Sequence, residues 1–162
     1  MMKRSLAALI STVACAGAAH AAVLSESNLS MADAQKLATA TVAACQAKGY
    51  NVSAAVVDRA GLLKAFARAD NAGPHTIEAS RAKAFTAASA KTPTLAMLEN
   101  TQKNPGAATL TDIPGFLVLG GGVPIKAGNG VIGAIGVAGA PGGHLDAQCA
   151  EAVLEENAAL FK

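Results

Sequence analysis

Aromatic side chains are scarce in this sequence, which has no tryptophan, one tyrosine and four phenylalanines although 52% of its residues are hydrophobic. Alanine and the aliphatic residues must therefore form the core, and such small side chains let a helix pack closely on a sheet. Familiar catalytic motifs are also missing, since no G-x-S-x-G, H-E-x-x-H or P-loop pattern occurs. The sequence thus gives no indication of the enzyme classes that these motifs mark.

The N-terminal segment has the pattern of a secretory signal peptide. Lys3 and Arg4 supply a positive start, residues 6–19 are apolar and uncharged, and Ala19-His20-Ala21 is a small–x–small cleavage site. The apolar run is shorter than the roughly 20 residues that span a bilayer, which disfavours a membrane anchor. We therefore expect residues 1–21 to be cleaved and the mature protein to be periplasmic or secreted.

Neither positive nor negative charge is in excess once this segment is set aside. The sequence has 13 Lys and Arg against 11 Asp and Glu, and removing Lys3 and Arg4 lowers the basic count to 11. Nucleic acids and anionic membranes both select a concentrated basic patch. We expect neither as a partner, no stable membrane insertion after cleavage, and a single domain over residues 22–162.

Helical and strand patterns alternate along the mature chain in the order α-ββ-αα-βββ-α. The apolar periodicity and the turn residues predict helices at about 31–48, 75–90, 93–100 and 145–160, a polar irregular stretch at 101–114, and strands at 52–57, 62–69, 116–119, 123–127 and 131–138.

Short turns connect the predicted strands and therefore indicate an antiparallel sheet. Asp58-Arg59-Ala60-Gly61 and Gly128-Asn129-Gly130 have hairpin chemistry. Strand 131–138 is apolar or glycine on both faces, so it needs cover on both sides, from helices or from another subunit. We predict a mixed α/β (α+β) fold, a profilin-like sandwich in which helices pack on a five-stranded antiparallel sheet.

Two cysteines remain after cleavage, Cys45 and Cys149, and each lies on the apolar stripe of its predicted helix. An oxidising compartment would permit a structural disulfide between them. The alternative is two buried free thiols, and the sequence leaves both open. A redox pair or thiolate metal site is not indicated, because no C-x-x-C motif occurs.

His75 is the main candidate for a binding residue. At the start of its predicted helix it shares a face with Ala79, Ala82 and Thr86, at spacings of four, seven and eleven residues. These small side chains would leave a shallow strip on which a planar macrocycle could lie, with its iron bound by the imidazole. The alternative is that the alanines only allow close packing and that His75 is a solvated helix start, and spacing alone favours this alternative.

Three residues of the preceding strand extend this candidate site. Lys64, Phe66 and Arg68 alternate onto one face of the strand. Phe66 could pack on a ring system and the two cations could meet the propionates of haem.

A set of ordered motifs resembles the GlcG/HbpS-like haem-binding family over most of the chain from Ser30 to Leu160. The motifs are Val56-Val57-Asp58-Arg59-Ala60-Gly61, Ala67-Arg68-Ala69-Asp70-Asn71-Ala72, Ala79-Ser80-Arg81-Ala82-Lys83-Ala84-Phe85-Thr86-Ala87, Gly120-Gly121-Gly122-Val123-Pro124-Ile125 and Ile132-Gly133-Ala134-Ile135-Gly136-Val137-Ala138-Gly139. The resemblance implies a profilin-like sandwich, homo-oligomers built on dimers, and haem binding in some members. It strengthens the hypothesis that His75 ligates haem iron.

Three functions follow in order of preference. The first is an exported haem-binding protein that sequesters, transports or senses haem without being an enzyme. The second is a haem-degrading enzyme, which would need a reductant. The third is an oligomeric accessory protein that binds a small acid and no haem.

Overall fold

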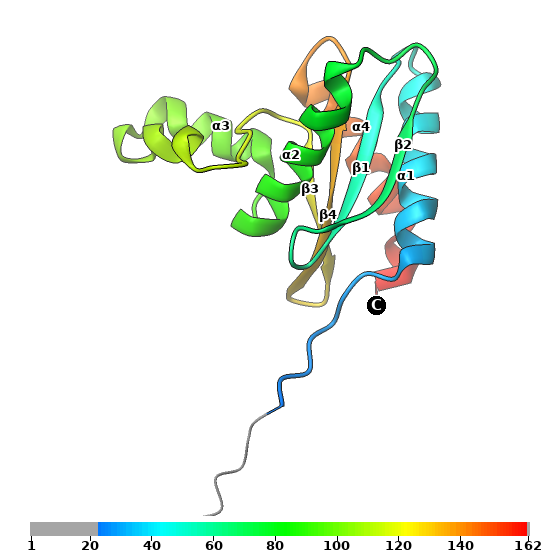
Figure 1. Ribbon diagram of the computed structural model, residues 1–162, viewed down its shortest axis with the longest axis horizontal. Coiled ribbons are helices and arrows are strands. Elements are labelled where there is room, and N and C mark those ends of the chain that lie inside the picture. The colour runs from blue at the N-terminus through cyan, green and yellow to red at the C-terminus, as the bar shows by residue number, and fades with distance from the viewer. Residues whose placement is uncertain (1–22, 162) are drawn as a thin grey trace, which may run out of the picture.

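The computed structural model describes residues 23–161 as three layers (Figure 1). The expected signal peptide lies outside these residues. Helices α1 (Met31–Gln46) and α4 (Gly143–Glu156) cover one face of a sheet, and α2 (His75–Ala90) covers the other. The mixed α/β sandwich expected from the sequence is confirmed.

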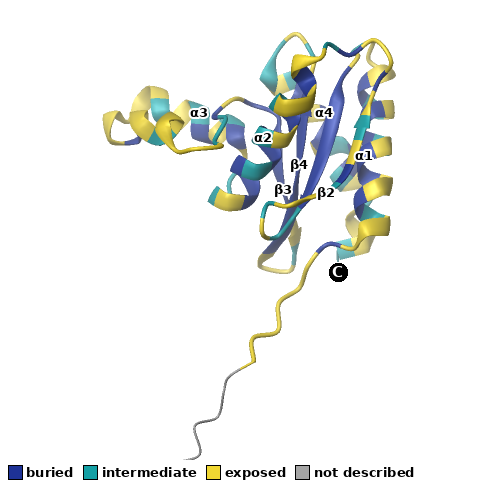
Figure 2. Ribbon diagram, in the orientation of Figure 1, coloured by how far each residue is buried: buried dark blue, intermediate teal, exposed yellow. Residues whose placement is uncertain are grey.

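The sheet has four antiparallel strands in the order β2-β1-β4-β3. Their bounds are β1 Ser53–Asp58, β2 Leu63–Arg68, β3 Gly122–Ala127 and β4 Gly130–Ala138. The central strands β1 and β4 are buried almost throughout, as Figure 2 shows, because helices lie on both of their faces. Outer strand β2 is partly exposed.

The expectation of a fifth strand at residues 116–119 is wrong. The segment is irregular, and helix side chains satisfy its backbone in place of a neighbouring strand. The N–H of Leu117 donates to Thr86 Oγ1 at 2.8 Å, and the carbonyl oxygen of Leu119 accepts from Thr94 Oγ1 at 2.7 Å. A short apolar run therefore need not form a strand when threonine hydroxyls satisfy its backbone N–H and C=O groups.

Close approach of α2 to β4 depends on small residues. The face of the sheet below α2 contributes Ala55, Val57 and Ala134 to a cluster with alanines of the helix. A Cβ at Gly136 would overlap the backbone carbonyl oxygen of Ser80 and lie 2.5 Å from the nitrogen of Ala84. Only glycine at position 136 allows the helix to cross the strand at this distance.

A disulfide joins Cys45 of α1 to Cys149 of α4, with a Cα–Cα distance of 5.4 Å. Both residues are fully buried in the core between these helices and the sheet. The structure thus contains the bridge, the first of the two arrangements that the sequence left open. It cross-links the first and last long helices of the fold.

Helix α3 (Thr94–Lys103) and the 3-10 helix η1 (Pro105–Asp112) project from the three layers as an arm (Figure 1). Most of η1 is exposed. The expected irregular stretch at 101–114 is therefore largely helical, and Asn104 starts the 3-10 turn by accepting a hydrogen bond from the N–H of Gly106 at 3.0 Å.

The C-terminal helix is shorter than expected, since α4 ends at Glu156 and the 3-10 helix η2 (Ala158–Phe161) follows it. In the part of the chain that the structure describes, none of the helices combines the length and apolar character that a membrane crossing needs.

Candidate functional site

A hollow of about 300 Å³ lies where α2 and α4 begin. We call it the His75 hollow. Its walls come from five places: helix α2, the end of strand β4, the loop between β4 and α4, the start of α4, and the irregular segment before β3. The lining residues are His75, Ala79, Lys83, Leu119, Ala138, Gly139, Ala140, Pro141, Gly142, Gly143 and Asp146.

Helix α2 supplies three lining residues at successive spacings of four. His75, Ala79 and Lys83 share one side of the helix because residues four apart lie on the same face. Exposure falls along this side, from the exposed His75 through the half-buried Ala79 to Lys83, which is 2% exposed. The imidazole thus stands at the rim of the hollow and the ammonium at its base.

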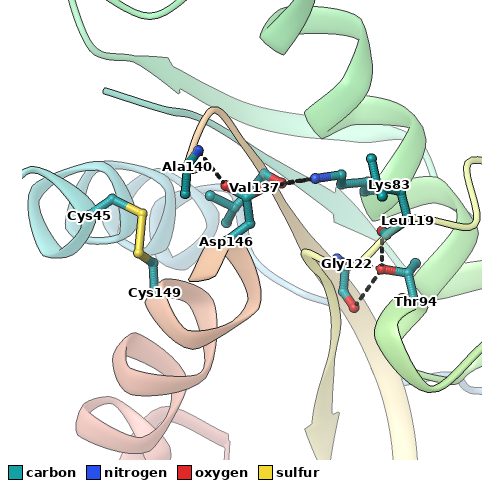
Figure 3. Close-up of polar contacts among 9 residues, drawn as sticks. All are labelled: Cys45, Lys83, Thr94, Leu119, Gly122, Val137, Ala140, Asp146 and Cys149. Carbon is teal, nitrogen blue, oxygen red and sulfur yellow. Dashed lines mark hydrogen bonds and ion pairs between the residues drawn. A yellow bond between two sulfur atoms is a disulfide. The ribbon is translucent and has the colours of Figure 1, made fainter. Parts of the chain in front are cut away.

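Lys83 forms a buried ion pair with Asp146 of α4, shown in Figure 3. The Nζ atom lies 2.8 Å from Asp146 Oδ2, and the two side chains are 2% and 4% exposed. The ammonium also donates to the carbonyl oxygen of Val137 at 2.8 Å, and Asp146 Oδ1 accepts from the N–H of Ala140 at 2.9 Å. These contacts connect α2, strand β4, the following loop and α4.

Burial raises the pKa of the Asp146 carboxyl above its ordinary value. The hydrogen bond and charge of Lys83, the N–H of Ala140 and the charge of His144 act in the opposite direction with smaller effects. Asp146 therefore takes up a proton at a higher pH than an exposed aspartate would.

Glycines allow the backbone to pass directly over this ion pair. Gly121 has φ +120°, and a Cβ there would lie 2.9 Å from Lys83 Nζ and 2.5 Å from the carbonyl oxygen of Val137. Next to it, Thr94 Oγ1 accepts from the N–H of Gly122 at 2.8 Å and donates to the carbonyl oxygen of Leu119. Thr94 thus fixes the segment that carries Leu119 to the hollow.

The structure brings together only some of the residues that the sequence suggested. His75 and Ala79 line the hollow. Ala82 and Thr86 lie further along α2, outside its lining, and Thr86 Oγ1 donates to the carbonyl oxygen of Ala82 at 2.7 Å. Thr86 Oγ1 also accepts a hydrogen bond from the N–H of Leu117, so Thr86 has a structural role in holding that segment. A contact of Ala82 and Thr86 with haem stays a prediction.

The strand residues of the candidate site lie elsewhere. Lys64 and Phe66 line a different hollow, at the edge formed by β2 and α1, with Gln35, Ala38 and Thr39. The guanidinium of Arg68 donates to the carbonyl oxygen of Ala72. None of the three belongs to the lining of the His75 hollow.

Sequence reasoning missed Lys83 and Asp146. Lys83 is eight residues after His75, so its position on the same helical side was available from spacing. Asp146 precedes Cys149 by three residues and lies on the buried stripe of α4. Lysine and aspartate are usually exposed, which hides such a pair until the helices are packed together.

The described residues contain no group of three or more His, Cys, Asp or Glu side chains that could hold a metal ion.

Comparisons with known proteins agree with this architecture. A family model described as haem degrading protein HbpS-like matches residues 29–155. Protein GlcG of Escherichia coli K12 is 37% identical over 107 residues, which are 64% of this chain and 78% of that protein. A double mutant of HbpS from Streptomyces reticuli has a crystal structure with TM-score 0.77 and 39% identity, covering 95% of this chain and 99% of that one. The crystal structure of a PduOC:heme complex has TM-score 0.70 and 25% identity over 79% of this chain and 94% of that chain.

Proposed function

This chain belongs to the HbpS-like family, and on that premise we propose that it is an exported haem-binding protein that sequesters, transports or senses haem. One observation carries the proposal: a histidine stands at the open rim of a hollow with apolar walls. The PduOC neighbour, whose structure is a haem complex, adds support from a relative of the same fold.

The residues of the hollow fit part of a haem group. Its volume of about 300 Å³ is at the lower end of the roughly 300–1,000 Å³ of ligand pockets that largely enclose a drug-sized molecule. One copy of the chain would therefore contact an edge or one face of the macrocycle. We propose that a second copy covers the rest, in keeping with the homo-oligomer that the family resemblance implies.

Each lining residue has a distinct role in this proposal. The imidazole of His75 would hold the iron. Ala79 leaves room beside the imidazole, and Leu119, which is 44% exposed, offers an apolar contact to the porphyrin. Haem, when bound, supplies an iron centre that can carry electrons or bind small ligands. Lys64, Phe66 and Arg68 would reach propionates only at a site formed with another copy.

A hemin titration tests the proposal. We expect the purified protein to develop a Soret band that saturates with hemin, and His75→Ala to weaken the affinity at least about tenfold with a changed spectrum. The matched control is His144→Ala, since His144 is the other histidine of the described residues, is also exposed, and does not line the hollow. A Soret band that His75→Ala leaves unchanged would remove His75 from the site.

Haem degradation is the second candidate, favoured by the description of the matching family model. Adding a reductant to the hemin complex in air separates the two candidates. A binding protein keeps its Soret band, whereas a degrading enzyme loses the band and releases iron.

Export is part of the proposal. We expect the mature protein recovered from the periplasm or the medium to begin at Ala22, which N-terminal mass spectrometry would measure. A mature protein that begins at Met1 would contradict it.

A further inference from the structure

One buried ion pair and its hydrogen bonds connect four of the parts that form the walls of the His75 hollow. Lys83 belongs to the same helix as His75, and it donates to Val137 at the end of β4 and to Asp146 of α4. Asp146 in turn accepts from Ala140 in the loop that forms the opposite wall. The histidine wall and the loop wall are thus connected through these contacts at the base of the hollow, as Figure 3 shows for the pair and its partners.

Apart from this contact, the polar contacts of this loop are mainly two backbone hydrogen bonds at its end, where the carbonyl oxygen of Gly142 accepts from the N–H groups of Leu145 at 2.9 Å and Asp146 at 3.2 Å. The loop consists of residues 139–142, and Gly139, Pro141, Gly142 and the following Gly143 have no side chain that could donate a hydrogen bond. Helix α4 begins at Gly143 without a side-chain cap. The carboxylate of Asp146 therefore replaces the local hydrogen bonds that side chains of a loop usually provide.

We propose that Lys83 and Asp146 are positioning residues, which hold the β4–α4 loop at a fixed distance from His75 and release it when Asp146 is protonated. The proposal rests on the proposed function, because it concerns the shape of the same hollow. Neither residue would ligate the iron in this proposal. Their effect on the ligand passes through the wall that Asp146 holds.

The charged groups around Asp146 set the direction of the pH response. Lys83 faces it from α2, His144 acts on it from its own helix, and His75 stands at the rim. Acid removes the carboxylate charge and weakens the contact with Lys83. Burial already raises the pKa of Asp146, so the change comes at a higher pH than for an exposed aspartate, while the rest of the fold stays intact.

Amide hydrogen exchange on the ligand-free protein tests the positioning directly. In the wild type we expect exchange of residues 138–143, corrected for the intrinsic rate, to increase on acidification. Asp146→Asn should exchange at least about tenfold faster there already at neutral pH, with little further change on acidification and no change in strand β3. His75→Ala should keep the wild-type profile. Glu26→Gln is the control, because it removes one partner of an exposed ion pair, Arg59–Glu26 at 2.9 Å.

The hemin titration then connects the wall to the ligand. We expect Asp146→Asn to weaken hemin binding about tenfold or more at neutral pH while Glu26→Gln leaves it unchanged. If Asp146→Asn does not fold, Lys83→Met combined with Asp146→Asn carries the test, because this pair of changes leaves no unpaired buried charge.

The outcomes of the two experiments are separable. Wild-type exchange and wild-type hemin affinity in Asp146→Asn would overturn the positioning role and leave haem binding intact. A flat hemin titration of the wild type would overturn the proposed function, while faster exchange at residues 138–143 in Asp146→Asn would still support the positioning of the loop.

Discussion

Removing the Cys45–Cys149 bridge tests how much of the stability depends on the connection between the first and last long helices. The bridge closes a loop over a sequence separation of 104 residues. In the chain-entropy model such a loop destabilises the unfolded state by about 4.7 kcal/mol. For a domain of this size, each kcal/mol shifts the melting temperature by roughly 3 °C. We therefore expect Cys45→Ala combined with Cys149→Ala to melt about 10–15 °C lower.

The assay is thermal unfolding followed by circular dichroism. Both cysteines are 0% exposed, so the alanines also remove buried sulfur atoms, and a second sample separates the two effects. This sample is wild-type protein that is reduced in denaturant and refolded with reductant present, which keeps the thiols and removes only the bond. A reduced wild type that melts within about 3 °C of the oxidised protein would refute the reasoning, because the loop-closure entropy alone predicts a larger change.

Two further outcomes concern Asp146 and the helix crossing. Because the folded-state pKa of Asp146 is raised above its ordinary value of 3.8, the folded protein keeps this proton over a pH window just above 3.8 in which the unfolded chain has released it. This residue should therefore lower the free energy of unfolding as the pH rises through that window. A wild type that loses stability relative to Asp146→Asn on acidification contradicts this sign. Gly136→Ala should cost about 3 kcal/mol or more or prevent folding, whereas the control Gly130→Ala, whose Cβ would have its nearest neighbour at 3.7 Å, should cost far less.

The hairpins were predictable because their turns have specific local chemistry. Asp58 Oδ1 accepts from the N–H groups of Ala60 and Leu62, which is the turn that the aspartate and glycine of this segment indicated. Apolar periodicity likewise placed α1 and α2 close to their observed bounds. Signals within a few residues of each other therefore gave most of the elements.

Features that depend on distant residues could not be predicted in this way. The segment 116–119 has the composition of a strand, but Thr86 and Thr94 bind its backbone from two helices that the sequence does not position. The partners Lys83 and Asp146 are 63 residues apart, and neither residue type indicates burial. Residue spacing did place His75 and Ala79 on one side of α2, but it could not show that Lys64 and Phe66 line a separate hollow.

The arm formed by α3 and η1 lies within the segment that the Cys45–Cys149 bond closes into a covalent ring. A protease that cuts the exposed backbone of η1 would therefore produce two polypeptides that remain attached to each other. The cut would become visible on a gel only after reduction, and the three layers could persist as a nicked molecule. The ring would thus let an exposed segment be cleaved without separating the two parts of the fold.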